Sequence, residues 1–303
     1  MTPPAEHPTG KRTPIAPQEP HPSSREPAEQ PVRRRRPATV TGGRLGSPDA
    51  ILRPTEAAQA IDVRRVPASE ALAETVDYHW YVGWRTAAPH RQQVVPQPRV
   101  HLAAEHGRLL VHGISREPFF RTLEGTGHTV GVAFHPGGFR PFLGRGVGTI
   151  SGTVTPAGDL LGLDDRPVAA HVLGDVDVPE MVAAVEGYLL ALDPPFDPAV
   201  AEVRALVAQA EEDRSITRAE QLAERSSTSL RSLQRLFTDY VGIGPKWVVA
   251  RFRILDAAAA AHGGDTVDWA ALAAELGFTD QAHLTRAFTA VVGTPPATYA
   301  REA

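Results

Sequence analysis

The sequence of 303 residues contains no cysteine. This absence excludes disulfide bonds, cysteine-based zinc fingers, iron–sulfur ligation and catalysis by a thiol. The N-terminus has no basic and then apolar pattern of a secretory signal. No stretch approaches the roughly 18 apolar residues needed to cross a bilayer. We therefore expect a protein of the cytoplasm that has no membrane partner.

Lysine is nearly absent as well, since only Lys11 and Lys246 occur, and arginine carries the positive charge. The formal net charge is −4, so the whole chain is not a general polyanion binder. Hydrophobic residues make up 42% of the chain, which is enough for a packed core. The length is consistent with two domains.

The first 40 residues contain ten prolines and few large apolar side chains. Such a composition cannot bury enough area to offset the entropy of ordering, so residues 1–45 are predicted to be a disordered tail. The tail includes the run Arg33–Arg36. We interpret this run as solvated; the alternative is a non-specific contact with phosphates.

Residues 60–175 show the pattern of a β-rich domain. Short runs of strand length alternate with Gly, Pro and His-Gly breaks: HWYVGW (79–84), QQVV (92–95), RVHLAAE (99–105), RLLVHGI (108–114) and HTVGVAF (128–134). His106-Gly107 between the third and fourth runs predicts a tight hairpin. Several short strands of this kind predict a β-barrel or a sandwich, and the phenylalanines of 134–143 then return the chain to the core.

From Pro179 onward the hydrophobic period becomes helical. Residues 176–200 are predicted to be a helical linker, and residues 201–303 an all-helical domain. The fold class is therefore α+β, with an N-terminal β-barrel or sandwich-like domain followed by an all-α domain.

The helical region contains an internal repeat. QLAERSSTSLRSLQRLF (221–237) aligns with ALAAELGFTDQAHLTRAF (271–288), at an offset of 50 before the turn and 51 after it. Each copy reads as a short helix, a tight turn and a second helix. We place the two helix-turn-helix units at 217–237 and 267–288.

Helix-ending and helix-starting residues support this interpretation. Thr217 with Glu220 fits a capping box at the start of the first unit. Gly277 can take the left-handed conformation that ends a helix, and Phe278 then packs back on it. Thr279 or Asp280 can cap the helix that follows.

The second helix of each unit carries Arg and Gln away from its apolar face, which suits the major groove of DNA. There, arginine bonds bidentately to guanine and glutamine to adenine. Residues 245–260 read as one long helix between the units. If this connector spaces the two helices by about one DNA turn, ~34 Å, both enter successive grooves.

The C-terminal hundred residues resemble AraC/XylS-type transcription regulators. The resemblance rests on LAERSSTSLRSLQRLF, VGIGPKWVVARFRILDAA, LAAELGFTDQAHLTRAF and VGTPPATYARE. It implies an all-helical domain that binds double-stranded DNA through both units. It also implies base contacts from seven residues: Arg231, Gln234, Arg235, Gln281, Ala282, His283 and Arg286. The alternative for these residues is a solvated helix face.

Two features depart from the family pattern. The first turn reads SST (226–228), where the family has apolar residues and a glycine. Residues 201–303 hold 11 Lys and Arg against 13 Asp and Glu, a net charge of −2, whereas DNA-binding domains usually show a basic face. We therefore expect modest affinity with strong dependence on salt.

The N-terminal domain resembles, more weakly, the β-barrel-type sensor of one branch of this family, through YHWYVGW, VVPQPRVHL, VHGI and FHPGGFRPFL. This resemblance implies binding of an effector, or formation of a homodimer. RNA polymerase is a further candidate partner. The histidines His79, His101, His112 and His135 are interpreted as surface or core residues, with metal ligation as the alternative. The aromatic residues Trp80, Trp84, Phe134, Phe139 and Phe142 are interpreted as core, with a ligand pocket as the alternative.

Three functions remain to be weighed. The first is a sequence-specific transcription regulator without catalytic residues, metal or cofactor. The second is an enzyme in the β-domain, with or without a bound metal ion, to which the helical domain is an appendage. The third, a DNA-repair regulator that accepts alkyl groups, needs an activated cysteine thiolate, and the chain has none.

Overall fold

The computed structural model describes residues 61–261 and 267–302. All of them lie within one compact unit, residues 42–303. The predicted tail of residues 1–45 with its arginine run lies outside the described residues, as do residues 262–266.

The N-terminal part is built on one antiparallel sheet with the strand order β1-β2-β5-β3-β4-β6. Its strands are β1 (Ile61–Pro67), β2 (Val76–Val94), β3 (His101–Glu105), β4 (Arg108–His112), β5 (Phe119–Phe134) and β6 (Val154–Pro156). The predicted β-rich domain is confirmed, but the sheet is open and not a closed barrel. Strand β6 has three residues and pairs with β4, and the chain then turns into a helix, so the sheet ends there.

Strand β2 unites the run 79–84 with residues 92–94 of the run 92–95, which the sequence separates. Its pairing with β5 shifts register between Thr86 and His90. Pro89 lies inside that shift. Proline has no N–H to donate, but the ladder needs no hydrogen bond from a residue at this place. The break between the two runs is therefore a bulge in a long strand.

The predicted hairpin is confirmed. His101–Glu105 pairs with Arg108–His112, with Glu105 opposite Arg108 at the turn. His106 and Gly107 have φ angles of 50° and 73°. Both angles are positive, as a type I′ turn requires.

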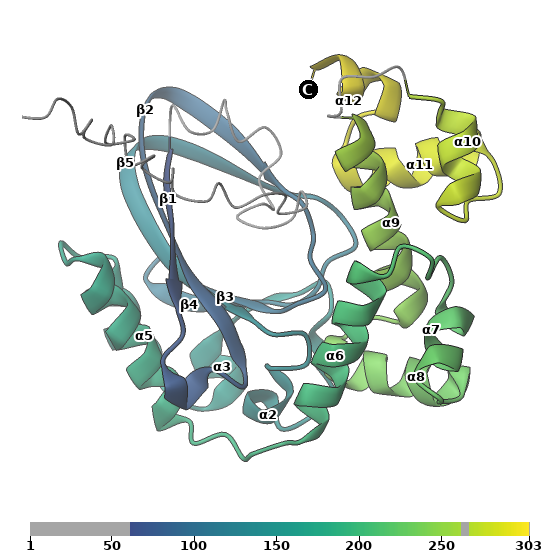
Figure 1. Ribbon diagram of the computed structural model, residues 1–303. Helices are drawn as coiled ribbons and strands as arrows, with labels where there is room; N and C mark the ends of the chain where they lie inside the picture. The colour runs from purple at the N-terminus through teal and green to yellow at the C-terminus, as the bar shows by residue number, and fades with distance from the viewer. Residues whose placement is uncertain (1–60, 262–266, 303) are drawn as a thin grey trace, which may run out of the picture. The chain divides into compact units, whose positions relative to one another are not determined.

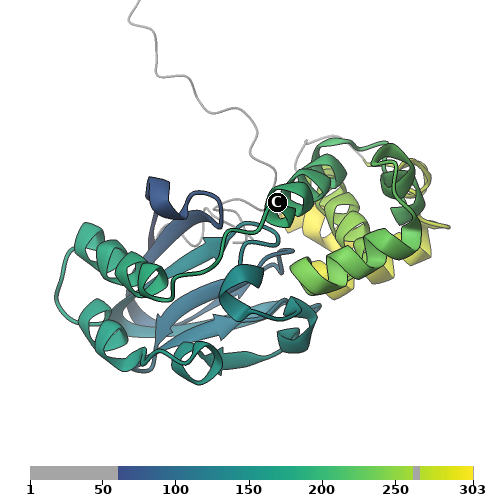
Figure 2. The same cartoon turned by 90° about the horizontal axis from the view of Figure 1, so that it is seen from below.

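The face of the sheet that carries Leu102, Ala104 and Val132 packs against helices (Figures 1 and 2). These elements are η1 (Glu70–Leu72), α2 (Arg140–Leu143), η2 (Val147–Ile150), α3 (Ala157–Leu161), α4 (Arg166–Val172) and α5 (Val178–Ala191). Phe134 and Phe139 meet edge to face in this core, with ring centroids 5.0 Å apart. After Phe134 the expected β-rich segment is thus mostly helical.

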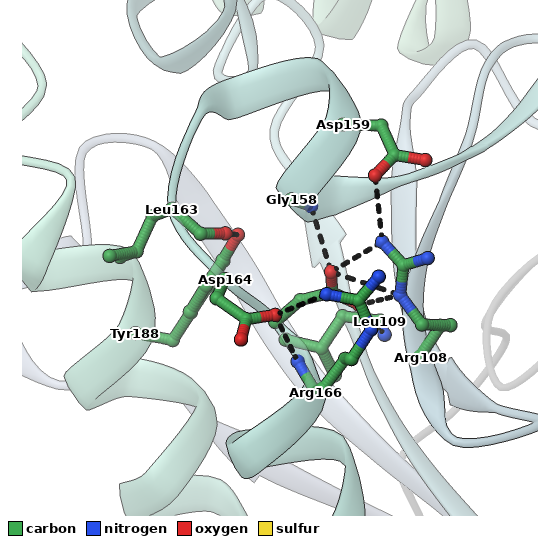
Figure 3. A network of polar contacts seen from close by, with 9 residues as sticks. Arg108, Leu109, Gly158, Asp159, Leu163, Asp164, Arg166 and Tyr188 are labelled. Carbon is green, nitrogen blue, oxygen red and sulfur yellow. Dashed lines mark hydrogen bonds and ion pairs between the residues drawn. The ribbon is translucent and has the colours of Figure 1, made fainter.

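A buried carboxylate ties these helices to the sheet (Figure 3). Asp165 is fully buried and accepts hydrogen bonds from the Arg108 guanidinium at 2.8 Å, the Leu109 N–H at 2.7 Å and the Gly158 N–H at 3.0 Å. Burial alone would raise the pKa of Asp165, but the bonds from Arg108 and the backbone outweigh it and lower that pKa. The role of this carboxylate is structural.

The C-terminal part is all-helical, as predicted. It comprises α6 (Ala199–Glu212), α7 (Ala219–Arg225), α8 (Leu230–Leu236), the π-helical turn η3 (Phe237–Val241), α9 (Pro245–Ala261), α10 (Trp269–Glu275), α11 (Gln281–Val292) and α12 (Pro296–Glu302). Helix α9 is shared by two hydrophobic cores: Val248 and Phe252 belong to the core of α7 and α8, and Ile254 and Ala258 to that of α10 and α11. Within the described residues, no helix is both long enough and apolar enough to cross a bilayer.

The middle of α9 is buried on all sides, and its charged residues are buried with it. Arg253 is fully buried and donates to the carbonyls of Ala210 at 2.8 Å and Asp213 at 3.1 Å, at the C-terminal end of α6. Asp256 lies 3.3 Å from Arg253 and 3.2 Å from Arg214. A cation at the last carbonyls of a helix satisfies their free acceptors and complements the helix dipole. This network anchors the connector helix to α6.

Candidate nucleic-acid interface

The two repeat units end their first helix in the same way. In the second unit the Phe278 N–H donates to the Ala273 carbonyl at 2.9 Å, and the Gly277 N–H to the Ala274 carbonyl at 3.1 Å. In the first unit the corresponding bonds run from Thr228 to Ala223, at 3.0 Å, and from Ser227 to Glu224, at 3.1 Å. Both are Schellman motifs, which need a left-handed residue after the helix.

The left-handed residue is a glycine in one unit and a serine in the other. Gly277 has a φ of 79° and Ser227 a φ of 52°. A side chain in this conformation brings Cβ close to the following carbonyl oxygen. The SST turn, which departs from the family pattern, therefore carries a local strain that the second turn lacks.

We expect the Ser227→Gly substitution to stabilise the protein by about 0.5–1 kcal/mol, because relief of the left-handed strain exceeds the extra entropy of glycine in the unfolded chain. Urea unfolding followed by circular dichroism measures this change. Ser226→Gly is the matched control. It should destabilise the protein, since Ser226 has a φ of −90° and its hydroxyl donates to the Leu222 carbonyl at 2.7 Å. A loss of stability in Ser227→Gly would contradict the strain argument.

The repeat extends further than the aligned sequences suggest. Helix α8 and the turn η3 together span residues 230–241, and α11 spans residues 281–292. Both ends of α11 thus lie 51 residues after the corresponding ends of the first unit. The glycines that follow, Gly242 and Gly293, have φ angles of 91° and 87°. Helices α9 and α12 then begin at Pro245 and Pro296, again 51 residues apart. Each unit is thus two helices, a glycine turn and the start of a third helix.

Caps set the start of each second helix. The Ser229 hydroxyl accepts from the Ser232 N–H at 3.1 Å, and the Asp280 carboxylate accepts from the His283 N–H at 2.7 Å. Of the two predicted caps, Asp280 is therefore the one used. A capping box at Thr217 and Glu220 is wrong: the side chain of Gln221 reaches back and accepts from the N–H groups of Thr217 at 2.8 Å and Arg218 at 2.9 Å.

The apolar residues of both second helices are buried and the candidate DNA-binding residues are exposed. Leu233, Phe237, Leu284 and Phe288 have no exposed surface. All seven candidates are exposed: Arg231, Gln234 and Arg235 on α8, and Gln281, Ala282, His283 and Arg286 on α11. The structure thus brings them together in two groups, one on each second helix.

The arginines of these groups have no ion-pair partner within the described part of the chain. Arg231, Arg235 and Arg286 lack one, whereas Arg225, near the end of α7, pairs with Asp213. An arginine whose donors are unused is free to bond to a base or a phosphate.

The ring of His283 is used locally. It lies edge to face against Phe278, with centroids 5.3 Å apart, and its Nδ1 accepts from the Thr279 N–H at 3.4 Å. These contacts hold the ring beside the turn while leaving the residue exposed. A base contact from His283 would therefore use Nε2.

Two successive helix-turn-helix units, each with an exposed polar second helix, define a helix-turn-helix DNA-binding protein. Residues 222–302 match a domain family described as a helix-turn-helix domain. This match identifies the C-terminal domain as an AraC-type helix-turn-helix domain, a kind of domain that DNA-binding transcription regulators carry. Residues 64–156 match a domain of unknown function, DUF6597.

Comparison with solved structures finds similarity to ToxT from Vibrio cholerae. One ToxT structure has a TM-score of 0.34 and 11% sequence identity, covering 80% of this chain and 97% of that one. A second, of wild-type ToxT with a bound unsaturated fatty acid, has a TM-score of 0.33 and 10% identity, covering 79% and 94%. No curated protein matches significantly.

The N-terminal sheet carries a second candidate site, a cavity of about 370 Å³ on the face opposite the helices. Alternate residues of the strands line it, among them Val82 on β2 and Ala103 on β3. Trp80 also lines the cavity, whereas Phe134, Phe139 and Phe142 belong to the core. Of the aromatic residues that the sequence offered as a pocket lining, Trp80 is thus the one that lines this cavity.

The four histidines have different surroundings. His101 and His112 face each other across β3 and β4 and line the cavity. His79 is fully buried on the other face, with Nε2 2.9 Å from the Glu186 carboxylate, and His135 lies 3.8 Å from Asp77. Among the described residues no group of three or more His, Asp and Glu side chains is placed to hold a metal ion.

Proposed function

We propose that the protein reads a specific DNA site with two recognition helices, α8 and α11, placed in successive major grooves of the duplex. The observation that supports this most strongly is the repeated unit: buried Leu and Phe at matched positions, with exposed Arg and Gln on the opposite side. Helix α9, which contributes to both cores, would hold the two helices at a constant separation.

Specific recognition would rest on placement and not on bulk charge. The arginines of α8 and α11 would supply bidentate bonds to guanine, and Gln234 and Gln281 bonds to adenine. Ala282 offers a methyl group to a thymine methyl. Because residues 201–303 carry a net charge of −2, binding to unrelated DNA should be weak.

Arg235→Ala and Arg286→Ala are each expected to cost about 1–3 kcal/mol of discrimination between the operator and scrambled DNA, without loss of folding. Fluorescence anisotropy with DNA from upstream of the protein's own gene, at two salt concentrations, measures this; pooled genomic fragments replace that DNA if it contains no operator. The matched control is Arg225→Ala, whose arginine is already paired with Asp213. Operator discrimination by both variants equal to that of the unmodified protein would contradict the assignment of the recognition helices.

We further propose that a small-molecule effector in the cavity controls DNA binding. Two residues of the cavity wall support this. Val95 belongs also to the core of α10 and α11, and Ile114 to the core of α7 and α8. A ligand that displaces the wall would therefore disturb the packing under both recognition helices.

The remaining expectations follow from this role. We propose a regulator without catalytic activity that works in the cytoplasm, with RNA polymerase and a second copy of the chain as candidate partners. Metal analysis of the purified protein tests the competing enzyme hypothesis, because stoichiometric zinc, iron or manganese would favour it.

A further inference from the structure

The charged groups inside the cavity are already neutralised by one another. The guanidinium of Arg99 pairs with Asp77. The carboxylate of Glu105 lies between Arg121 and His112, with His112 Nε2 at 3.4 Å. Burial raises the pKa of Glu105, but its bonds with His112 and Arg121 outweigh burial and lower it to about 2.

The rim is balanced as well. The exposed Arg65 lies over the ring of Tyr78, with 3.9 Å between the guanidinium carbon and the ring centroid, and Glu117 is the exposed acidic residue of the lining. A charged ligand would therefore find no unpaired opposite charge among the buried lining residues that the structure describes. Burying an uncompensated charge is costly.

Arg99 Nε and His112 Nε2 make no hydrogen bond with the described residues, but both side chains belong to the ion pairs above. Outside those ion pairs, the indole of Trp80 and the ring of His101 have polar atoms that no described residue uses. The indole Nε1 of Trp80 is buried and has no hydrogen-bond partner among the described residues. An indole nitrogen can only donate, so its partner must be an acceptor. The ring of His101 also makes no hydrogen bond with the described residues. Burial, with the nearby Arg99 and His112, lowers the pKa of His101 to about 3, so the ring is neutral.

The position of Trp80 is set by the opposite strand. Trp80 pairs with Gly131 on β5, and a Cβ at Gly131 would come within 2.2 Å of the indole ring. The ring therefore covers the glycine closely and cannot move toward the strand. Around it the lining is apolar, with Val63, Val82, Ala103 and Ile114.

From this arrangement we infer that the cavity binds an uncharged, largely apolar molecule with a carbonyl-type acceptor, which receives the hydrogen bond of Trp80 Nε1–H. The inference rests on the proposed control of the regulator by a ligand in this cavity. A volume of about 370 Å³ lies within the range of sites that hold small organic ligands.

The experiment is a fluorescence titration of the full chain with two dyes of similar size. Prodan is an uncharged aryl ketone, and 1-anilinonaphthalene-8-sulfonate is an anion. We expect saturable binding of prodan, and binding of the anion at least about tenfold weaker. Absent prodan binding, or an anion bound as tightly as the ketone, would overturn the inference.

A matched pair of variants tests the hydrogen bond. Trp80→Phe keeps an aromatic ring and removes the N–H, and should weaken prodan binding about three- to tenfold. Trp84→Phe lies on the same strand, and the Trp84 Nε1 donates to the Glu124 carbonyl at 3.2 Å outside the cavity lining. This control should leave prodan binding unchanged. Equal prodan affinities of the two variants would remove Trp80 as the donor.

DNA binding by the same preparations separates the two proposals. Loss of operator recognition with intact prodan binding would contradict the proposed function and leave the chemistry of the cavity standing. Intact operator recognition without prodan binding would contradict the inference about the ligand and leave the DNA-binding function standing.

Discussion

Gly277→Ala is expected to destabilise the protein by about 2–4 kcal/mol and to abolish operator recognition. Two effects add. The residue has a φ of 79°, where a side chain is strained, and a Cβ there would lie 2.5 Å from the Cβ of Thr217. The turn would have to open, which displaces the start of α11 and with it Gln281, Ala282 and His283.

Gly162→Ala is the matched control for this substitution. Gly162 has a φ of 81° and also ends a helix, but a Cβ there would meet no atom within 4 Å. It should cost about 1–2 kcal/mol, the strain alone, and leave DNA binding unchanged. Urea unfolding and anisotropy with operator DNA measure both variants. Equal losses of stability would show that the contact with Thr217 contributes nothing.

Arg253→Met is expected to destabilise the protein by about 3–5 kcal/mol, the usual cost of breaking a buried ion pair from one side. The substitution removes the Arg253 guanidinium from the buried Asp256 carboxylate and uncaps the carbonyls at the end of α6. Urea unfolding followed by circular dichroism is the measurement. A cost below about 1 kcal/mol would mean that the network is not needed for stability.

Two comparisons separate the buried network from charge in general. Arg225→Met removes a half-exposed ion pair with Asp213 and should cost no more than about 1 kcal/mol. The double variant Arg253→Met/Asp256→Leu should recover part of the loss, because it replaces both members of the buried pair by apolar side chains.

The repeated unit and its exposed polar side chains could be predicted because both depend on residues close together in the sequence. A helix end depends on a few neighbouring residues, so Gly277, Phe278 and Asp280 were interpretable from spacing and caps alone. The exposure of Arg235 and Arg286 likewise follows from the 3.6-residue period once Leu284 and Phe288 are taken as core. That these exposed residues contact bases stays a prediction.

The prediction of the capping residue was wrong because two neighbouring side chains could fill the same role. Glu220 and Gln221 are neighbours, and either can reach back to a helix start. The structure uses Gln221, and Glu220 stays exposed. The separation of the runs 79–84 and 92–95 has a related cause: the proline between them excludes a ladder hydrogen bond but not a bulge.

The two-part organisation, the hairpin at His106-Gly107 and the duplicated helix-turn-helix unit are predictable from the amino-acid order, since each depends on residues close together in the chain. The open sheet, the burial of Arg253 and Asp256 in a core, and the cavity lined by Trp80, His101 and Glu105 become visible in three dimensions alone. These features depend on residues far apart in the chain whose burial depends on what packs over them. A charge pattern alone cannot distinguish a solvated arginine from one that caps a distant helix.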